Sequence, residues 1–315
     1  MSDILSDLDA AAEAGLTDME RLERLAANLH AQGIDFRIER GRLIQSAHDR
    51  HTDQETALLF DTDRLKIGVV SDTHGGSKFE QLSALKAFYR EAEDEGVSAF
   101  IHGGDLTQGP DEMHRGMVHE IHAHGADAQV DYVARTYPLA GVPTYVISGN
   151  HDDSHLKQGG VNIVRRVTQQ RDDLKYLGQD AAYLTINGIR AYVAHPDGGG
   201  SYAKSYKGQK FSEALPVDRD VRLLLIGHYH NTVNFWQRRT KVFQLGCFQS
   251  QYAWLARKGL HPDIAGLILD IRFDDAGNIG RIDYSERRYE PIPDDWDHAV
   301  SDAVSRAWQT GDLVA

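Results

Sequence analysis

The chain has 315 residues, of which 41% are hydrophobic and 26% are charged, and this composition is typical of a globular protein with room for one large domain and a small appendage. Its formal net charge of -13 argues against a protein that coats nucleic acid, although a local basic patch is compatible with it. The single cysteine, Cys247, excludes an intrachain disulfide, and no apolar stretch approaches the roughly 20 residues that span a membrane, so we expect a cytoplasmic protein with no membrane partner.

Residues 1–60 are predicted to form a small N-terminal module. Thr17 and Glu20 have the spacing of a helix capping box, and leucines at helical spacing follow as far as Gly33. The alternating stretch IDFRIERGRLI then predicts a hairpin that turns at Arg40 and Gly41. Two interpretations stay open: a winged-helix-like module, or a helical lid packed on the main domain.

From residue 61 onward, strands and helices alternate. The buried strand LKIGVVSD is followed by a helix in KFEQLSALKAFYREAEDEG, by the strand VSAFIHGGD, by a helix from Met113 to Tyr137, and by the strand PTYVISGNHD. This alternation predicts a parallel sheet with helices on its faces.

After Leu174 the pattern shifts to strands. AAYLTINGIRAYVAH is predicted to be a hairpin that turns at Asn187 and Gly188. Five further strands are expected in VRLLLIGHYH, TVNFWQ, KVFQLG, IAGLILDIRFD and GRIDYSERRYE. We therefore treat residues 61–315 as one domain of the α/β (α+β) class.

Polar residues recur where the predicted strands end. They are Asp72, His74, Asp105, Asn150, His151, Asp152, His195, His228 and His230. Ligands of open α/β sheets gather beyond the carboxyl ends of the strands. Imidazole, carboxylate and amide oxygen suit divalent metals, and this set is too large for one ion with open positions. It suits two ions that share one carboxylate, hold a hydroxide between them and clamp a phosphate oxygen.

The motifs D-T-H, G-G-D, G-N-H-D, a lone His after a strand and G-H-Y-H occur in this order between Leu65 and Glu290. In this order they resemble the calcineurin-like metallophosphoesterase family. The resemblance implies a two-sheet β-sandwich flanked by helices. It also implies that a metal-bridging hydroxide hydrolyses a phosphate ester.

The resemblance assigns a role to each residue of the motifs. Asp72, His74 and His230 would bind the first metal, Asn150, His195 and His228 the second, and Asp105 would bridge both. His151 would protonate the leaving oxygen or stabilise its charge, and Asp152 would hold and polarise His151. Manganese is the expected metal, with iron, zinc, cobalt and nickel as alternatives. Two departures are Pro196, where the family usually has Gly, and LTQG, which lacks a later Asp or Asn.

Further residues near the motifs are candidates for substrate contacts. His114 and Arg115 follow Asp105 on a loop that is expected to border the site, whereas the next three histidines of that segment are interpreted as a solvated helix face. In Gly198–Lys210, Tyr202 and Tyr206 alternate with Lys204 and other lysines, a composition that stacks bases and holds phosphates. The alternative is a glycine loop that leads into an ordinary helix.

These features favour a phosphodiesterase or nuclease acting on DNA or RNA. The motif order is also similar to the phosphoesterase subunit of archaeal replicative polymerases and to the repair nuclease that partners an SMC-like ATPase. Many phage and prophage chains are of this general type, so a role in DNA metabolism is expected. One alternative is a small-molecule phosphodiesterase or phosphomonoesterase. Another is a non-catalytic accessory subunit of a DNA-processing complex, which would act through a protein partner. The His151–Asp152 pair argues against the accessory subunit, because a structural metal site needs no acid beside it.

Overall fold

The computed structural model describes residues 17, 36–39, 42–45, 55–58, 60, 62–274 and 278–310. The chain divides into two compact units, Met1–Arg50 and His51–Ala315. In the first unit, β1 (Phe36–Glu39) pairs antiparallel with β2 (Arg42–Gln45), so the predicted pairing of these strands is confirmed. The helix predicted after Thr17 lies outside the described residues.

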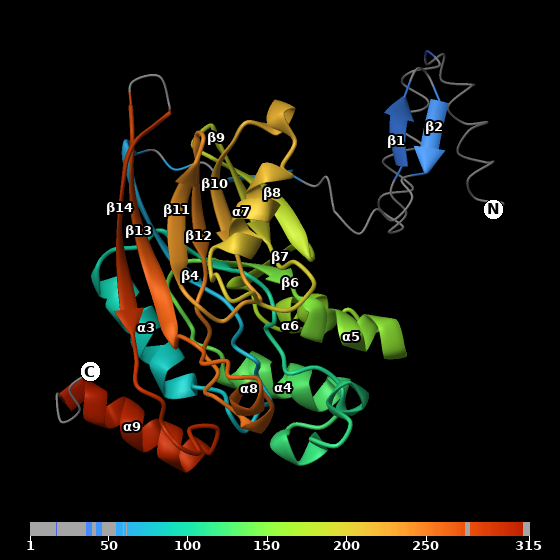
Figure 1. The fold of residues 1–315 in the computed structure, drawn as a ribbon, viewed down its shortest axis with the longest axis vertical. Helices are drawn as coiled ribbons and strands as arrows, with labels where there is room; N and C mark the ends of the chain where they lie inside the picture. The colour runs from blue at the N-terminus through green and yellow to red at the C-terminus, as the bar shows by residue number, and fades with distance from the viewer. Residues whose placement is uncertain are drawn as a thin grey trace. The chain divides into compact units, whose positions relative to one another are not determined.

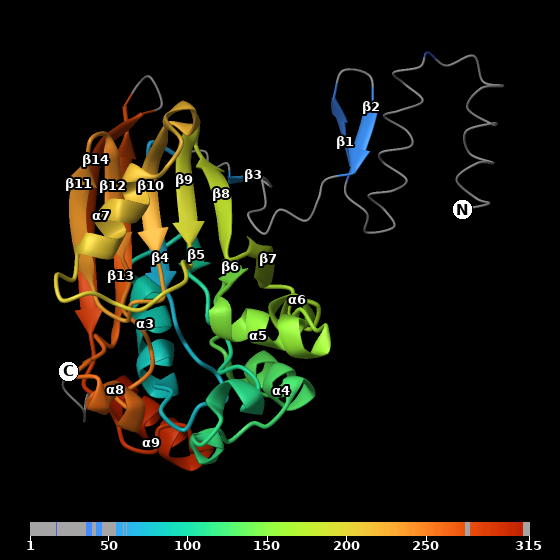
Figure 2. The same cartoon turned by 45° about the vertical axis from the view of Figure 1, so that its right-hand side comes forward.

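The second unit contains two six-stranded sheets, which face each other in Figures 1 and 2. Sheet I has the strand order β14 (Ile279–Arg288), β13 (Ala265–Phe273), β4 (Arg64–Val70), β5 (Ala99–His102), β6 (Thr144–Ser148) and β7 (Leu174–Gln179). Strands β4 to β7 are parallel, as the alternation of strands and helices predicted. The C-terminal pair β13 and β14 extends the sheet in antiparallel fashion.

Sheet II has the strand order β11 (Val233–Gln237), β12 (Thr240–Gln244), β10 (Val221–Ile226), β9 (Ile189–Ala194), β8 (Ala181–Ile186) and β3 (Glu55–Leu58). The hairpin β8–β9 turns at Asn187 and Gly188, which have φ values of 46° and 88°, as the Asn-Gly pair predicted. Strand β3 pairs in parallel with β8, so residues 55–58 belong to this unit and not to the N-terminal module.

Helices cover the outer faces of the sheets. The α-helices are α3 (Leu82–Asp94), α4 (Ala126–Thr136), α5 (Asn150–Gly159), α6 (Ile163–Thr168), α7 (Tyr206–Glu213), α8 (Ala253–Arg257) and α9 (His298–Thr310). Apolar residues of α3, α4 and α6 form one core with the outer face of sheet I, and α9 packs against this core through Trp308. Helix α7 packs through Phe211 on the outer face of sheet II. Among the described residues, no helix is long and apolar enough to cross a membrane.

The single helix predicted from Met113 to Tyr137 is wrong. The segment holds two short 3-10 turns, η1 (Asp111–His114) and η2 (Val118–Glu120), before α4 begins. Gly116 lies between the two turns and Gly125 directly precedes α4; their positive φ values of 84° and 83° are incompatible with a continuous α-helix. A third 3-10 turn, η3 (Val217–Arg219), precedes β10.

A second core lies between the sheets and follows from strand alternation. In β10, Leu223 and Leu225 belong to the cluster between the sheets, whereas Leu224 and Ile226 belong to the cluster under α7. Burial of each such side chain stabilises the fold by roughly 1.5–3 kcal/mol. The two-sheet architecture flanked by helices is therefore confirmed, and its rigid strands fix the loops at their carboxyl ends.

Candidate metal centre

Loops at the carboxyl ends of five central strands meet at one end of the sandwich. Asp72 and His74 follow β4, Asp105 follows β5, and Asn150 begins α5 directly after β6. From sheet II, His195 follows β9, and His228 and His230 follow β10. The backbone N–H of His228 donates to both carboxylate oxygens of Asp72, at 3.2 and 3.0 Å, so the two sheets are joined at the site.

The backbone of these loops is strained. Five of the predicted ligands have left-handed φ values although they are not glycine, namely Asp72 (52°), His74 (49°), Asp105 (53°), His228 (79°) and His230 (53°). Such conformations cost of order 1–3 kcal/mol each and cluster at functional sites. The fold therefore holds these side chains in place at a cost in stability.

The first group of donor atoms consists of Asp72, His74 and His230, which lie within 4.8 Å of one another. His230 Nε2 lies 3.2 Å from Asp72 Oδ1 and 3.1 Å from His74 Nε2. One carboxylate and two imidazoles thus point at a common centre.

The second group consists of Asp105, His195 and His228, again within 4.8 Å of one another, and Asn150 joins it. Asn150 Oδ1 lies 2.8 Å from His228 Nδ1 and 3.2 Å from His195 Nε2. His195 lies in this group although Pro196 follows it, and its Nε2 is 3.1 Å from Asp105 Oδ2.

One carboxylate oxygen joins the two groups. Asp105 Oδ2 lies 3.1 Å from His195 Nε2 of the second group and 4.0 Å from His74 Nε2 of the first. The second oxygen, Oδ1, accepts a hydrogen bond from the backbone N–H of His151 at 2.8 Å. Asp105 thus has the position that a bridging ligand of two ions requires.

Backbone carbonyls set the tautomers of two histidines. His195 Nδ1 donates to the Gly103 carbonyl at 2.8 Å, and His228 Nε2 donates to the Gly198 carbonyl at 2.7 Å. Because a carbonyl oxygen only accepts, these nitrogens carry the protons. His195 Nε2 and His228 Nδ1 are therefore left to bind a metal.

The charges of the site are coupled. Burial would raise the pKa of Asp105, but His195 and His151 lower it well below its ordinary value. Burial would lower the pKa of His195, but Asp105 and Asp72 raise it to about 10. Burial would also lower the pKa of His230, but Cys247, followed by Asp72, raises it well above its ordinary value. Without a metal, two protonated histidines balance the two carboxylates, and a divalent cation would replace those protons.

Two glycines allow the loops to approach closely. A Cβ at Gly149 would lie 2.3 Å from Asp105 Oδ1, and a Cβ at Gly227 would lie 2.4 Å from both the Gly103 carbonyl and Ser71 Oγ. The glycines of the GNH and GHYH motifs are thus required by the space around the ligands.

His151 stands at the rim of the site and is half-buried. Its ring meets that of His74 edge-on, with centroids 4.6 Å apart, and its Nδ1 donates to the Gln108 carbonyl at 2.7 Å. The same carbonyl accepts from His114 Nε2 at 2.8 Å. This arrangement leaves Nε2 of His151 to face a substrate.

The predicted contact between Asp152 and His151 is wrong. Asp152 accepts from the backbone N–H groups of Gly149, Leu106 and Thr107, and from the Thr107 hydroxyl, at 2.8 to 3.0 Å. Burial, followed by the charge of Asp105, raises the pKa of Asp152 to about 7. Asp152 therefore ties the start of α5 to the loop that carries Asp105, and the Gln108 carbonyl holds His151.

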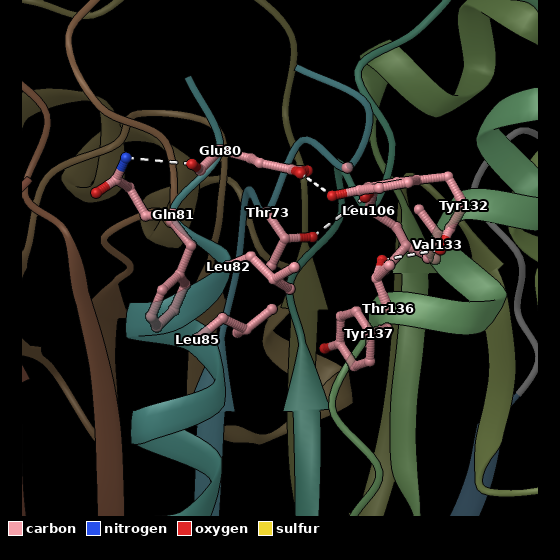
Figure 3. A pocket seen from close by; sticks show the side chains of 12 residues that line it. Thr73, Glu80, Gln81, Leu82, Leu85, Leu106, Tyr132, Val133, Thr136 and Tyr137 are labelled. Carbon is pink, nitrogen blue, oxygen red and sulfur yellow. Dashed lines mark hydrogen bonds between the residues drawn. The ribbon is translucent and has the colours of Figure 1, made fainter. Parts of the chain in front are cut away.

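A buried polar network supports the first ligand loop from behind (Figure 3). Glu80 accepts from the Gly76 N–H at 3.0 Å and from the Tyr132 hydroxyl, and Thr73 donates to the Leu106 carbonyl at 3.2 Å. The cavity between these residues measures about 20 Å³, which is room for one water and no substrate. The polar network around this cavity therefore supports the ligand loop and does not bind substrate.

The predicted substrate contacts have different surroundings. His114 is buried against Gln108, and Arg115 is exposed. Tyr202 is fully exposed, and Lys204 pairs with Asp263 at 3.8 Å. Tyr206 is half-exposed at the start of α7, in a segment that begins at the glycine contacting His228.

The expectation that the histidines after Arg115 form a solvated face is only partly met. His122 Nε2 lies 3.3 Å from Glu80 Oε1, and its ring stacks on Trp296. His124 pairs with Asp111 at 3.0 Å, and His119 lines a separate cavity.

The acceptors that hold His151, His195 and His228 are backbone carbonyls, which sequence analysis missed. The only signal for any of them was the unusual LTQG, which contains Gln108.

The comparisons with known proteins agree with this geometry. The model of the calcineurin-like phosphoesterase superfamily domain matches residues 65–256. No curated protein matches the chain.

Several solved structures are similar. A novel archaeal phosphodiesterase is 15% identical with a TM-score of 0.41, and the match covers 71% of this chain and 100% of that one. A putative 5'-nucleotidase from Staphylococcus aureus is 13% identical with a TM-score of 0.43, and the match covers 77% of this chain and 58% of that one. Zinc-complexed Vps29 from Entamoeba histolytica is 12% identical with a TM-score of 0.37, and the match covers 72% of this chain and 100% of that one. Because the family model spans more than half of the chain and the motifs converge on one site, the chain belongs to the calcineurin-like phosphoesterase superfamily.

Proposed function

We propose that the chain hydrolyses phosphate diesters with two divalent metal ions, of which manganese is the first candidate. The observation that carries the proposal is the position of Asp105 Oδ2 between the two donor groups. A site for a single ion would not need a carboxylate shared in this way.

The donor set fits borderline divalent ions. Asp72, His74 and His230 would hold one ion, Asn150, His195 and His228 the other, and Asp105 both. When bound, the two ions would supply Lewis-acid charge to a phosphate oxygen and lower the pKa of an attacking water. The strained loops keep the ligands oriented before an ion arrives.

His151 would act on the leaving group. The Gln108 carbonyl fixes its Nδ1–H, so Nε2 is the atom that would donate to the departing oxygen or stabilise its charge. One nitrogen of this ring lies within 4.8 Å of donor atoms of both His74 and Asp105, which places His151 beside both donor groups. A site that bound metal for structure alone would have no use for such a group.

A nucleic acid is the diester that the Tyr/Lys segment favours. Tyr202 is exposed for stacking, and the segment begins at Gly198 beside a proposed ligand. The second candidate is a small diester or a phosphomonoester, which the net charge of -13 favours.

The test compares bis(4-nitrophenyl) phosphate with 4-nitrophenyl phosphate in the presence of Mn²⁺. We expect faster hydrolysis of the diester, loss of activity with a chelator, and recovery when the ion returns. Preference for the monoester would replace the diesterase proposal. Two bound ions without turnover of any ester would favour the accessory-subunit alternative.

A further inference from the structure

A second cavity, which the hydrolysis described above does not use, measures about 640 Å³. This volume falls within the range of roughly 300–1,000 Å³ that is typical of small-molecule sites. Its walls include Phe79, Ser250, Ile264 and Ile292, which come from well-separated parts of the chain.

The cavity walls are fastened to the first donor group. The Phe248 N–H donates to the Asp72 carbonyl at 3.0 Å, two residues before Ser250. The Asp263 N–H donates to the His230 carbonyl at 2.7 Å, one residue before Ile264. The wall residue Phe79 lies five residues after His74 in the chain, and its carbonyl accepts from the Ser250 N–H at 2.8 Å. Two wall segments, those at Ser250 and Ile264, are therefore connected through near neighbours to the backbone of Asp72 and His230 in the first group.

The charges of the lining disfavour a second phosphate. Lys78 is the one lysine of the described lining, which contains no arginine; two carboxylates, Glu120 and Asp294, and two histidines, His119 and His261, share the lining with it. The Nζ of Lys78 also lies 5.8 Å from the ring centroid of Trp296, an aromatic contact that occupies this cation. Phosphate binding calls for an excess of cationic donors, which these walls do not supply.

The remaining lining suits an uncharged ring. Phe79, Ile264, Ile292 and three prolines give apolar surface, and Ser250 and Gln251 add hydroxyl and amide groups. We propose that this cavity binds the uncharged, ring-bearing organic group that is esterified to the scissile phosphate, a group of nucleoside size. The proposal rests on the proposed diester hydrolysis and names its substrate class: the group in the cavity ends the substrate, and no second phosphate follows it.

The experiment uses three esters with the same leaving group, so that the chemistry is matched. They are methyl 4-nitrophenyl phosphate, thymidine 5'-(4-nitrophenyl phosphate), and the same thymidine ester with an added 3'-phosphate. We expect kcat/KM for the thymidine ester to exceed that of the methyl ester by about tenfold or more, because only the former fills the cavity. The added 3'-phosphate should remove most of this advantage.

Two variants fill the cavity from different walls, Ser250→Trp and Ile292→Trp. Both should lose the advantage of the thymidine ester while the methyl-ester rate stays within about twofold, which also shows that the protein is folded. Lys175→Trp, on the exposed surface of β7, is the matched control and should keep the advantage. Inhibition of methyl-ester hydrolysis by free thymidine in the unaltered protein provides a readout that needs no variant.

Equal kcat/KM for the methyl and thymidine esters, with no inhibition by thymidine, would overturn the cavity proposal and leave diester hydrolysis intact. Equal loss of the advantage in Lys175→Trp would also overturn it. If no ester is cleaved, the proposed function fails, and calorimetry with thymidine then decides on the cavity. Binding that Ser250→Trp abolishes would support the cavity, and absence of binding would refute it.

Discussion

Among single residues, His195 and His230 bear protons in the metal-free site. Burial opposes protonation of both, but Asp105 and Asp72 raise the pKa of His195 to about 10, and Cys247, followed by Asp72, raises the pKa of His230 well above its usual range. A metal must displace these protons, so we expect the affinity for Mn²⁺ to rise with pH, by about tenfold per pH unit for each proton released. Calorimetry in buffers of different ionisation enthalpy measures the protons directly. Binding without proton release at pH 7 would contradict this charge assignment.

His151 should matter for turnover and not for metal binding. We expect His151→Ala to keep both ions and to lower kcat by about 10²–10⁴-fold, because assistance to the leaving group is lost. The loss should be smaller for an aryl ester than for an alkyl ester, whose leaving oxygen needs the proton more. Elemental analysis supplies the control for metal content. An equal loss for both esters would count against the role in leaving-group protonation.

The sequence predicted the residues of the site but not their supports. Asp and His at the strand ends could be located because strands and their order are visible in the pattern. The hydrogen bond from His151 to Gln108 could not be predicted, because its acceptor is a backbone carbonyl and every residue has one. The assignment of Asp152 failed for the same reason, since three of its four donors are backbone N–H groups.

At the scale of elements, the turn from β6 into α5 depends on Gly149. A methyl group there would meet Asp105 Oδ1 at 2.3 Å and the Asp105 N–H nitrogen at 2.5 Å. We therefore expect Gly149→Ala to displace the shared carboxylate and to weaken binding of both ions by about tenfold or more. Gly159→Ala, near the end of the same helix and with open space around it, is the control. Metal titration of the two variants measures this difference in affinity. Equal metal affinities of Gly149→Ala and Gly159→Ala would show that the turn can relax around the added methyl group.

Strand β5 ends in a histidine that must stay neutral. His102 Nδ1 accepts from the Gly104 N–H at 3.2 Å, and burial is the first cause that lowers its pKa from 6.5 to about 4. Between these values the unfolded chain binds more protons than the folded one, so the contribution is complete above pH 6.5 and is lost as the pH falls toward 4.

Acidification from pH 7 to 5.5 should thus lower the free energy of unfolding by about 1 kcal/mol through His102 alone. Urea unfolding of the metal-free protein and of His102→Asn at both pH values isolates this effect, because the other titrating groups are common to both. The same pH dependence in both proteins would mean that His102 is not responsible.

Element type was easier to predict than element ends. The Asn187–Gly188 turn has a local cause, the left-handed conformation that both residues adopt readily, and the hairpin formed as expected. The segment from Met113 to Tyr137 has helical composition, but glycines at 116 and 125 break it into shorter turns. Tertiary contacts such as that of His122 with Glu80 then fix its path, and no local pattern shows them.

For the molecule as a whole, the contribution of the first 50 residues can be separated from that of β3. None of the proposed ligands precedes Asp72, and the second compact unit begins at His51. A chain that starts at His51 should therefore hold two ions and hydrolyse bis(4-nitrophenyl) phosphate like the full chain. If the N-terminal module binds nucleic acid, the chain that starts at His51 should lose only affinity for DNA or RNA. A binding assay on the shorter and the full chain would show this loss. Loss of small-diester hydrolysis in a folded product would instead assign residues 1–50 to the active site.

A chain that starts at Thr62 should be less stable than one that starts at His51. It lacks β3, whose residues pair with β8, and it lacks Leu58, which is buried in the core between the sheets. Loss of this side chain alone should lower the free energy of unfolding by roughly 1.5–3 kcal/mol. Without β3, the edge of β8 is also open to pairing with other chains, so the shorter protein should aggregate more readily. Urea unfolding and light scattering of the two chains measure both effects. The ligand loops lie on the central strands, so the shorter chain should still bind metal while it is folded. Equal stability of the two chains would show that β3 adds little to the sheet.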